Sequence, residues 1–150
     1  MQKCVCVFGE ERFLIGRCNV YSHQILRGDD TMNKSKSTQE LIALLVQSYE
    51  IIDKVKDEGD YKINNREMKK CIKLHNLIAE DLKLAEEIYG LLLEHSCISV
   101  KTASAYQSLK LDIYVDKSVN ILEELAKRTD IGTRRLSAEM CLRVWRGEIQ

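Results

Sequence analysis

Residues 66–93 read REMKKCIKLHNLIAEDLKLAEEIYGLLL, and apolar side chains recur along them at alternating intervals of three and four residues. This spacing is typical of an α-helix that packs against other helices. The seam consists of Met68, Cys71, His75, Ile78, Leu82, Ala85, Tyr89 and Leu92, with a second stripe beside it of Leu74, Leu77, Leu84, Ile88 and Leu91. Side chains on two adjacent stripes must be buried against neighbours on more than one side of the helix. The pattern therefore predicts one continuous helix inside a bundle.

The composition fits one globular domain without a membrane segment. Of the 150 residues, 45% are hydrophobic and 31% are charged, and proline, which breaks helices, does not occur. Lys plus Arg and Asp plus Glu both number 23, so the net charge is zero. This balance argues against a protein that coats nucleic acid or an anionic membrane over its whole surface, although it leaves room for a local basic patch.

The cysteines indicate a reducing environment. The six cysteines are Cys4, Cys6, Cys18, Cys71, Cys97 and Cys141, and none of them forms a Cys-x-x-Cys pair. The first residues lack the long apolar run of a secretion signal, and Cys71 lies on the helix seam, where a thiol acts as a small hydrophobic group. We therefore expect a cytoplasmic protein with reduced thiols.

The first 31 residues differ from the rest of the chain. Residues 4–8 and 13–21 are rich in β-branched and other apolar side chains and flank a glycine-containing turn, which predicts a β-hairpin. Residues 27–31 have the composition of a turn or linker. We expect two parts, an N-terminal appendage of residues 1–31 and a helical domain of residues 32–150.

Capping residues predict where the other helices begin and end. Ser37 opens a capping box, and Gly59 suits the position after a helix end. Asn64 or Asn65 is expected to cap the central helix, and Thr133 to start the last one. The predicted fold is therefore mainly α, an antiparallel bundle of about four helices.

Two irregular positions lie inside the predicted helices. Apolar and polar residues alternate over residues 108–115, which is the period of a strand, yet both neighbouring segments have helical periodicity. We expect a helix there, within a longer helix over residues 100–128. Gly90 interrupts the central seam, where it indicates either a close helix approach, an early helix end or a tolerated interior glycine.

Residues 125–137, LAKRTDIGTRRLS, combine a Leu-Ala pair, a glycine-containing turn and a small polar run. This segment resembles the helix-turn-helix of phage-type repressors, in which Ala126, Ile131 and Leu136 match the buried positions. Asp130 and Glu139 depart from the family's preference for Gly and an aliphatic residue. The resemblance implies a DNA-binding unit over residues 119–146, with DNA contacts from Lys127, Arg128, Thr133, Arg134 and Arg135. The alternative is a helix hairpin that closes the bundle, with a solvated basic side.

The wide apolar face favours a different function, a non-catalytic interaction module that binds a protein partner or a second copy of itself. His75 and Tyr89 on the seam, together with Trp145 near the C-terminus, are the predicted interface residues. The DNA-binding regulator is the alternative function. Without nucleophile, phosphate-loop or Glu-x-x-His motifs, we expect no enzyme activity, metal or other cofactor.

Overall fold

The structure is a computed structural model that describes residues 36–150. These residues form six α-helices and no strand, which confirms the predicted α class and bundle packing. The helices are α2 (Thr38–Glu58), α3 (Tyr61–Ala79), α4 (Leu82–Leu92), α5 (Ile98–Lys110), α6 (Val115–Lys127) and α7 (Arg134–Trp145). The predicted hairpin of residues 1–31 and the boundary after it lie outside the described residues.

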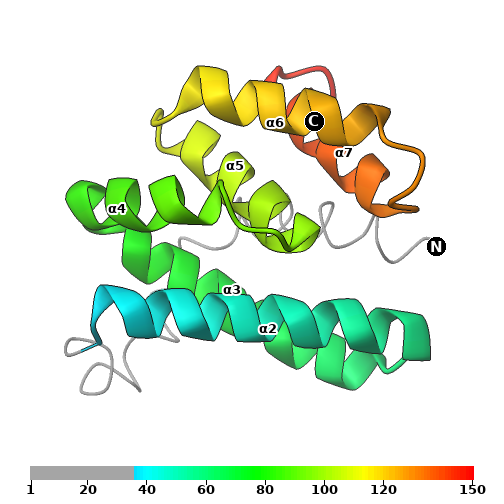
Figure 1. The fold of residues 1–150 in the computed structure, drawn as a ribbon, viewed down its shortest axis with the longest axis horizontal. Helices are drawn as coiled ribbons and strands as arrows, with labels where there is room; N and C mark the ends of the chain where they lie inside the picture. The colour runs from blue at the N-terminus through cyan, green and yellow to red at the C-terminus, as the bar shows by residue number, and fades with distance from the viewer. Residues whose placement is uncertain (1–35) are drawn as a thin grey trace.

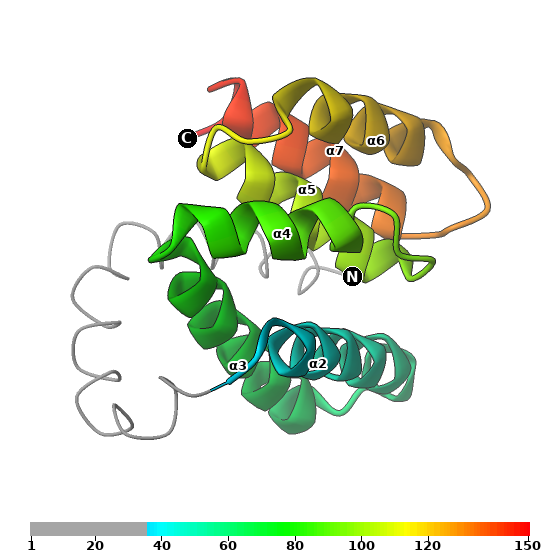
Figure 2. The same ribbon diagram turned by 60° about the vertical axis from the view of Figure 1, so that its left-hand side comes forward.

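The helices are arranged in three layers (Figures 1 and 2). Helices α2 and α3 form the lowest layer in Figure 1, α4 and α5 the middle layer, and α6 and α7 the top layer. The middle layer packs on both others, because α4 contacts α2 and α3 while α5 contacts α6 and α7. The expectation of about four helices was therefore too low.

The predicted continuous helix over residues 66–93 is wrong, because the chain turns between Ala79 and Leu82. The Asp81 carboxylate accepts hydrogen bonds from the backbone N–H groups of Lys83 and Leu84, at 3.0 and 3.3 Å. An aspartate in this position caps the start of a new helix. Seam residues on both sides of the turn enter one common core, but Leu82 at the start of α4 is 52% exposed.

The capping predictions for α2 are confirmed, and that for α3 is wrong. Ser37 Oγ accepts a hydrogen bond from the backbone N–H of Glu40 at 3.2 Å, and Gly59 closes α2 with φ +76°. Helix α3 begins at Tyr61 rather than near Asn64, because the Asp60 carboxylate accepts from two backbone N–H groups of its first turn. An earlier aspartate therefore takes the capping role predicted for an asparagine.

The predicted helix over residues 100–128 is also divided. Residues 111–114 form a turn between α5 and α6, in which Asp112 and Tyr114 adopt positive φ angles of 57° and 47°. Residues 108–115 are thus neither a strand nor one helix. Helix α7 begins directly after Thr133, whose side chain makes no capping hydrogen bond. Gly90 marks a close approach, since a Cβ atom there would lie 2.9 Å from the Tyr114 hydroxyl.

Two hydrophobic cores fill the layers. The N-terminal core is built mainly from α2, α3 and α4 and consists of Leu41, Leu45, Tyr49, Ile52, Cys71, Leu74, Ile78, Ala85, Ile88, Tyr89, Leu92, Val100 and Ile113. The C-terminal core is built mainly from α5, α6 and α7 and consists of Leu93, Ala105, Tyr106, Leu109, Leu122, Leu125, Ile131, Ala138, Cys141 and Leu142. Helix α5 contributes to both and joins them.

Candidate functional site

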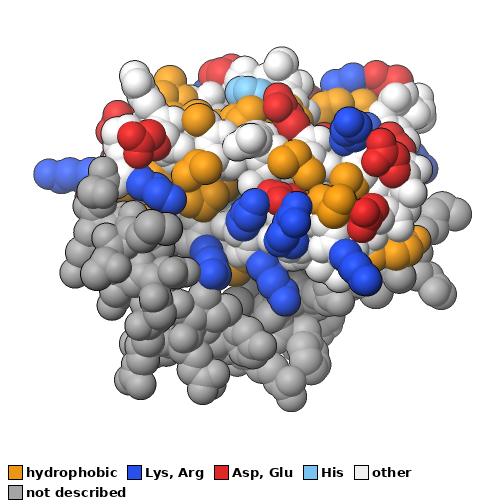
Figure 3. Space-filling view, turned by 90° about the horizontal axis from the view of Figure 1, so that it is seen from below, with side chains coloured by type: hydrophobic (Ala, Val, Ile, Leu, Met, Phe, Trp, Pro, Cys, Tyr) orange, Lys and Arg blue, Asp and Glu red, His pale blue; other side chains and the backbone are white. Residues whose placement is uncertain are grey.

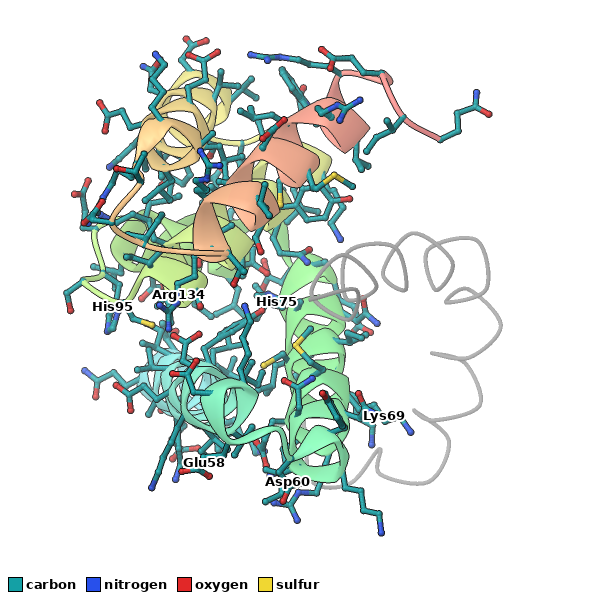
Figure 4. All side chains as sticks on the ribbon, turned by 90° about the vertical axis from the view of Figure 1, so that its right-hand side faces the viewer. Glu58, Asp60, Lys69, His75, His95 and Arg134 are labelled. Carbon is teal, nitrogen blue, oxygen red and sulfur yellow. The ribbon has the colours of Figure 1, made fainter. Side chains whose placement is uncertain are left out.

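His75 lies in the N-terminal core between two tyrosines. Its Nε2 atom is 2.9 Å from the Tyr49 hydroxyl, and its Nδ1 atom is 2.7 Å from the Tyr89 hydroxyl. Figure 4 shows His75 on the side of α3 that faces the bundle. The three side chains come from α2, α3 and α4, so this tyrosine–histidine–tyrosine chain connects three helices.

Burial keeps the histidine and Tyr89 neutral. It lowers the pKa of His75 to about 3, with a smaller effect from the positive charge of Lys110, and it raises the pKa of Tyr89. A neutral imidazole has one donor and one acceptor nitrogen, so one tyrosine donates and the other accepts. The side chain of His75 is 3% exposed and cannot reach an external substrate, which makes this chain of hydrogen bonds a structural element.

The three predicted interface residues lie in different environments. His75 and Tyr89 are interior, with 3% and 0% exposure, so a partner that meets the described surface does not reach them. Trp145 is 40% exposed at the end of α7. Of the three predicted interface residues, only Trp145 therefore lies at the surface, because neighbouring helices cover the part of the apolar face that carries His75 and Tyr89.

The Asp53 carboxylate on α2 accepts hydrogen bonds from two segments that are distant in the sequence. Its Oδ1 atom accepts from Ser99 Oγ at 2.6 Å and from Arg134 Nε at 3.4 Å, and its Oδ2 atom accepts from Cys97 Sγ at 3.7 Å. We call these four residues the Asp53 junction. It ties the starts of α5 and α7 to α2, and Figure 4 shows Arg134 and His95 on the side of α2 that faces α5 and α7.

The Asp53 junction lacks the chemistry of a thiol active site. Burial raises the pKa of Cys97, and the nearby Asp53 carboxylate raises it further, whereas a nucleophilic cysteine needs a lowered pKa. The Nδ1 atom of the neighbouring His95 accepts a hydrogen bond from the backbone N–H of Cys97 at 3.0 Å. Between residues 36 and 150, no group of three or more His, Cys, Asp or Glu side chains could hold a metal ion.

The five predicted DNA contacts are spread over the α6–α7 connection. Lys127 and Arg135 are exposed, and Thr133 directly precedes α7. Arg128 forms an ion pair with Asp130 at 2.6 Å, and Arg134 is held by Asp53. The amino end of the proposed recognition helix is thus tied to α2 through one of its two arginines.

A basic side of α3 escaped the sequence analysis. It consists of Lys62, Arg66, Lys69, Lys70 and Lys73, which recur at helical spacing and are exposed except for the half-buried Lys73. In Figure 3, which views the α2–α3 layer, Lys and Arg side chains gather in the lower half of the described surface and most carboxylates lie above them. The helical spacing of these cations is present in the sequence, on the side of the helix opposite the apolar seam.

Comparison of the chain with family models, with curated proteins and with solved structures finds no match. The described helices include none with the length and apolar character needed to cross a membrane.

Proposed function

We propose that the protein is a non-catalytic interaction module that binds another protein surface through an apolar patch centred on Trp145. The first partner to test is a second copy of the chain. Zero net charge favours such self-association, because two copies experience little mutual repulsion. The partner would thus meet an apolar surface, as expected from the sequence, but at the end of α7 only.

The position of Trp145 carries this proposal. Ala138, Cys141 and Leu142 form the buried seam of α7, and Trp145 continues that seam by one further helical step. Unlike those three residues, it is 40% exposed. An exposed tryptophan that prolongs a buried seam offers a large apolar area at low entropic cost, which is the character of an interface hot spot.

Trp145 is the only tryptophan of the chain, so its fluorescence reports directly on this patch. We expect sedimentation velocity to show dimers at micromolar concentrations and the emission maximum to shift to shorter wavelength as they form. Trp145→Ala should weaken dimerisation by about tenfold or more. Leu91→Ala is the matched control, since Leu91 is 60% exposed on α4, away from the patch. A monomer with concentration-independent emission would overturn the proposal.

A DNA-binding regulator with residues 119–146 as its reading unit is the second candidate. It is supported by the exposed side chains of Lys127 and Arg135, which flank the α6–α7 connection. The ion pairs of Arg128 and Arg134 weigh against it, because they occupy two of the five proposed contacts. Salt-sensitive binding to duplex DNA that is lost with Arg134→Ala plus Arg135→Ala would support this candidate.

A further inference from the structure

The solvent-facing side of α3 carries charges of one sign. Its five cationic residues are Lys62, Arg66, Lys69, Lys70 and Lys73. At 100° per residue they lie within about 100° of arc, and with a rise of about 1.5 Å per residue they extend over about 16 Å. The residues between and beside them on this side include Asn65 and Asn76, and no carboxylate.

The single acidic residue of α3 is turned inward. Glu67 is 1% exposed and accepts hydrogen bonds from Ser48 Oγ at 3.0 Å and from Lys70 Nζ at 2.9 Å. A weaker bond from Arg66 Nε measures 3.4 Å. The hydrogen bond from Lys70 is the main cause of the lowered pKa of Glu67, and this carboxylate holds the charged groups of Lys70 and Arg66 close to α3. Two further cations, Lys62 and Lys69, have no ion pair with the carboxylates of residues 36–150, and Glu67 balances only one of the two positive charges of Arg66 and Lys70.

We propose that this side of α3 binds the phosphate backbone of a nucleic acid. Arg, Lys and Asn side chains are the usual phosphate contacts, and duplex DNA carries one negative charge for about each 1.7 Å of its axis. A basic stripe about 16 Å long therefore faces several phosphates at once. Because the net charge of the chain is zero, attraction to phosphate must come from a local group of cations rather than from the whole surface.

The residue types favour phosphate over an acidic protein surface. Four of the five cations are lysines, a residue that is depleted in protein–protein interfaces because its compact charge is strongly hydrated. Exposed large apolar side chains, which protein interfaces use as anchors, are limited on α3 to Tyr61 at its first position. The site also differs from the proposed helix-turn-helix, which uses α6 and α7, and from the Trp145 patch.

The test measures binding of the full chain to a fluorescein-labelled 20-base-pair DNA duplex, and to a single-stranded RNA of equal length, by fluorescence anisotropy. For four to five phosphate contacts the slope of log affinity against log salt is about −4 on a duplex. Lys62→Gln plus Lys69→Gln should weaken binding by about tenfold or more at 50 mM salt and make the slope shallower by about 2. The variant keeps Glu67 and its partners, so circular dichroism should be unchanged.

Lys54→Gln plus Lys83→Gln is the matched control, because it removes the same charge from exposed lysines of α2 and α4. It should change the affinity by less than twofold. Binding to the duplex or to the RNA that depends on Lys62 and Lys69 supports the proposal. Four results overturn it: no binding to either probe at 50 mM salt, equal losses in both variants, a loss confined to Lys127→Gln plus Arg135→Gln, or tighter binding to poly-L-glutamate than to either nucleic acid.

Discussion

The two cores of this protein treat their buried polar groups in opposite ways. In the N-terminal core, every nitrogen and hydroxyl of the Tyr49–His75–Tyr89 chain has a partner, and the Glu67 carboxylate is similarly satisfied. In the helices of the C-terminal core, the hydroxyls of Ser108 and Ser118 are buried without a hydrogen-bond partner among the described residues. Satisfied polar networks specify one arrangement of their helices, whereas orphaned hydroxyls lower stability. Hydrogen bonds between buried side chains therefore add to apolar packing in the first core, whereas the second core depends on apolar packing, mainly of leucines.

The largest expected difference between the two cores is their sensitivity to acid, because the buried His75 lies in the N-terminal core. The pKa of His75 is about 3 in the folded state and near its ordinary value of 6.5 in the unfolded state. Between these values the unfolded chain binds the proton, so stability present above pH 6.5 is lost as the pH falls toward 3. At pH 4 this loss amounts to about 3 kcal/mol. The lowered pKa of Glu67 acts in the same direction at the acidic end.

Urea unfolding at pH 7, 5 and 4 measures this loss. His75→Gln should be less stable than the natural protein at pH 7 but should lose much less stability on acidification. His95→Gln keeps the same number of histidines and leaves the buried chain intact, so it serves as the control. An unchanged pH dependence in His75→Gln would show that acid acts elsewhere.

Removing one hydroxyl from the buried chain should have the next largest effect. Tyr89→Phe leaves His75 Nδ1 without its partner at 2.7 Å, and a buried unsatisfied group costs about 1–3 kcal/mol. The comparison is Tyr114→Phe, which removes a hydroxyl that donates to the Glu86 carbonyl at 3.0 Å on the exposed surface. Its cost should stay below about 1 kcal/mol in thermal or urea unfolding. Equal costs in the two variants would remove the distinction between the buried chain and a surface hydrogen bond.

The Asp53 junction tests how firmly α5 and α7 are tied to α2. Double-mutant cycles in urea should give a coupling of about 1 kcal/mol for Asp53→Ala with Ser99→Ala, because that hydrogen bond is short and part-buried. The coupling for Asp53→Ala with Arg134→Ala should be smaller, since the 3.4 Å ion pair is partly solvated, and it should weaken further in 0.5 M salt. A larger coupling for Arg134 would make the ion pair the main tie of α7.

Local signals were predictable from sequence, and contacts between distant residues were not. Ser37 and Gly59 act within one turn of their own helix, so their caps could be predicted. Asp81 was missed although it is an equally local cap, because the apolar seam runs through the turn in register. The partners of His75 lie 26 and 14 residues away, and only the folded arrangement brings their hydroxyls to its two nitrogens. The periodicity of the seam predicted that other helices would cover His75 and Tyr89, but it could not identify the residues that those helices bring to the histidine.

The smallest expected effect has the opposite sign and comes from the second core. Ser118→Ala removes a fully buried hydroxyl that has no partner among the described residues, and it places a better helix former inside α6. We expect a gain of about 0.5–1 kcal/mol in the free energy of unfolding. Ser48→Ala is the matched change in the first core, where the hydroxyl donates to Glu67, and it should destabilise the protein. If both substitutions changed the free energy of unfolding in the same direction, buried serines in the two cores would not differ in how well they are satisfied. The difference between the cores would then rest on the tyrosine–histidine–tyrosine chain alone.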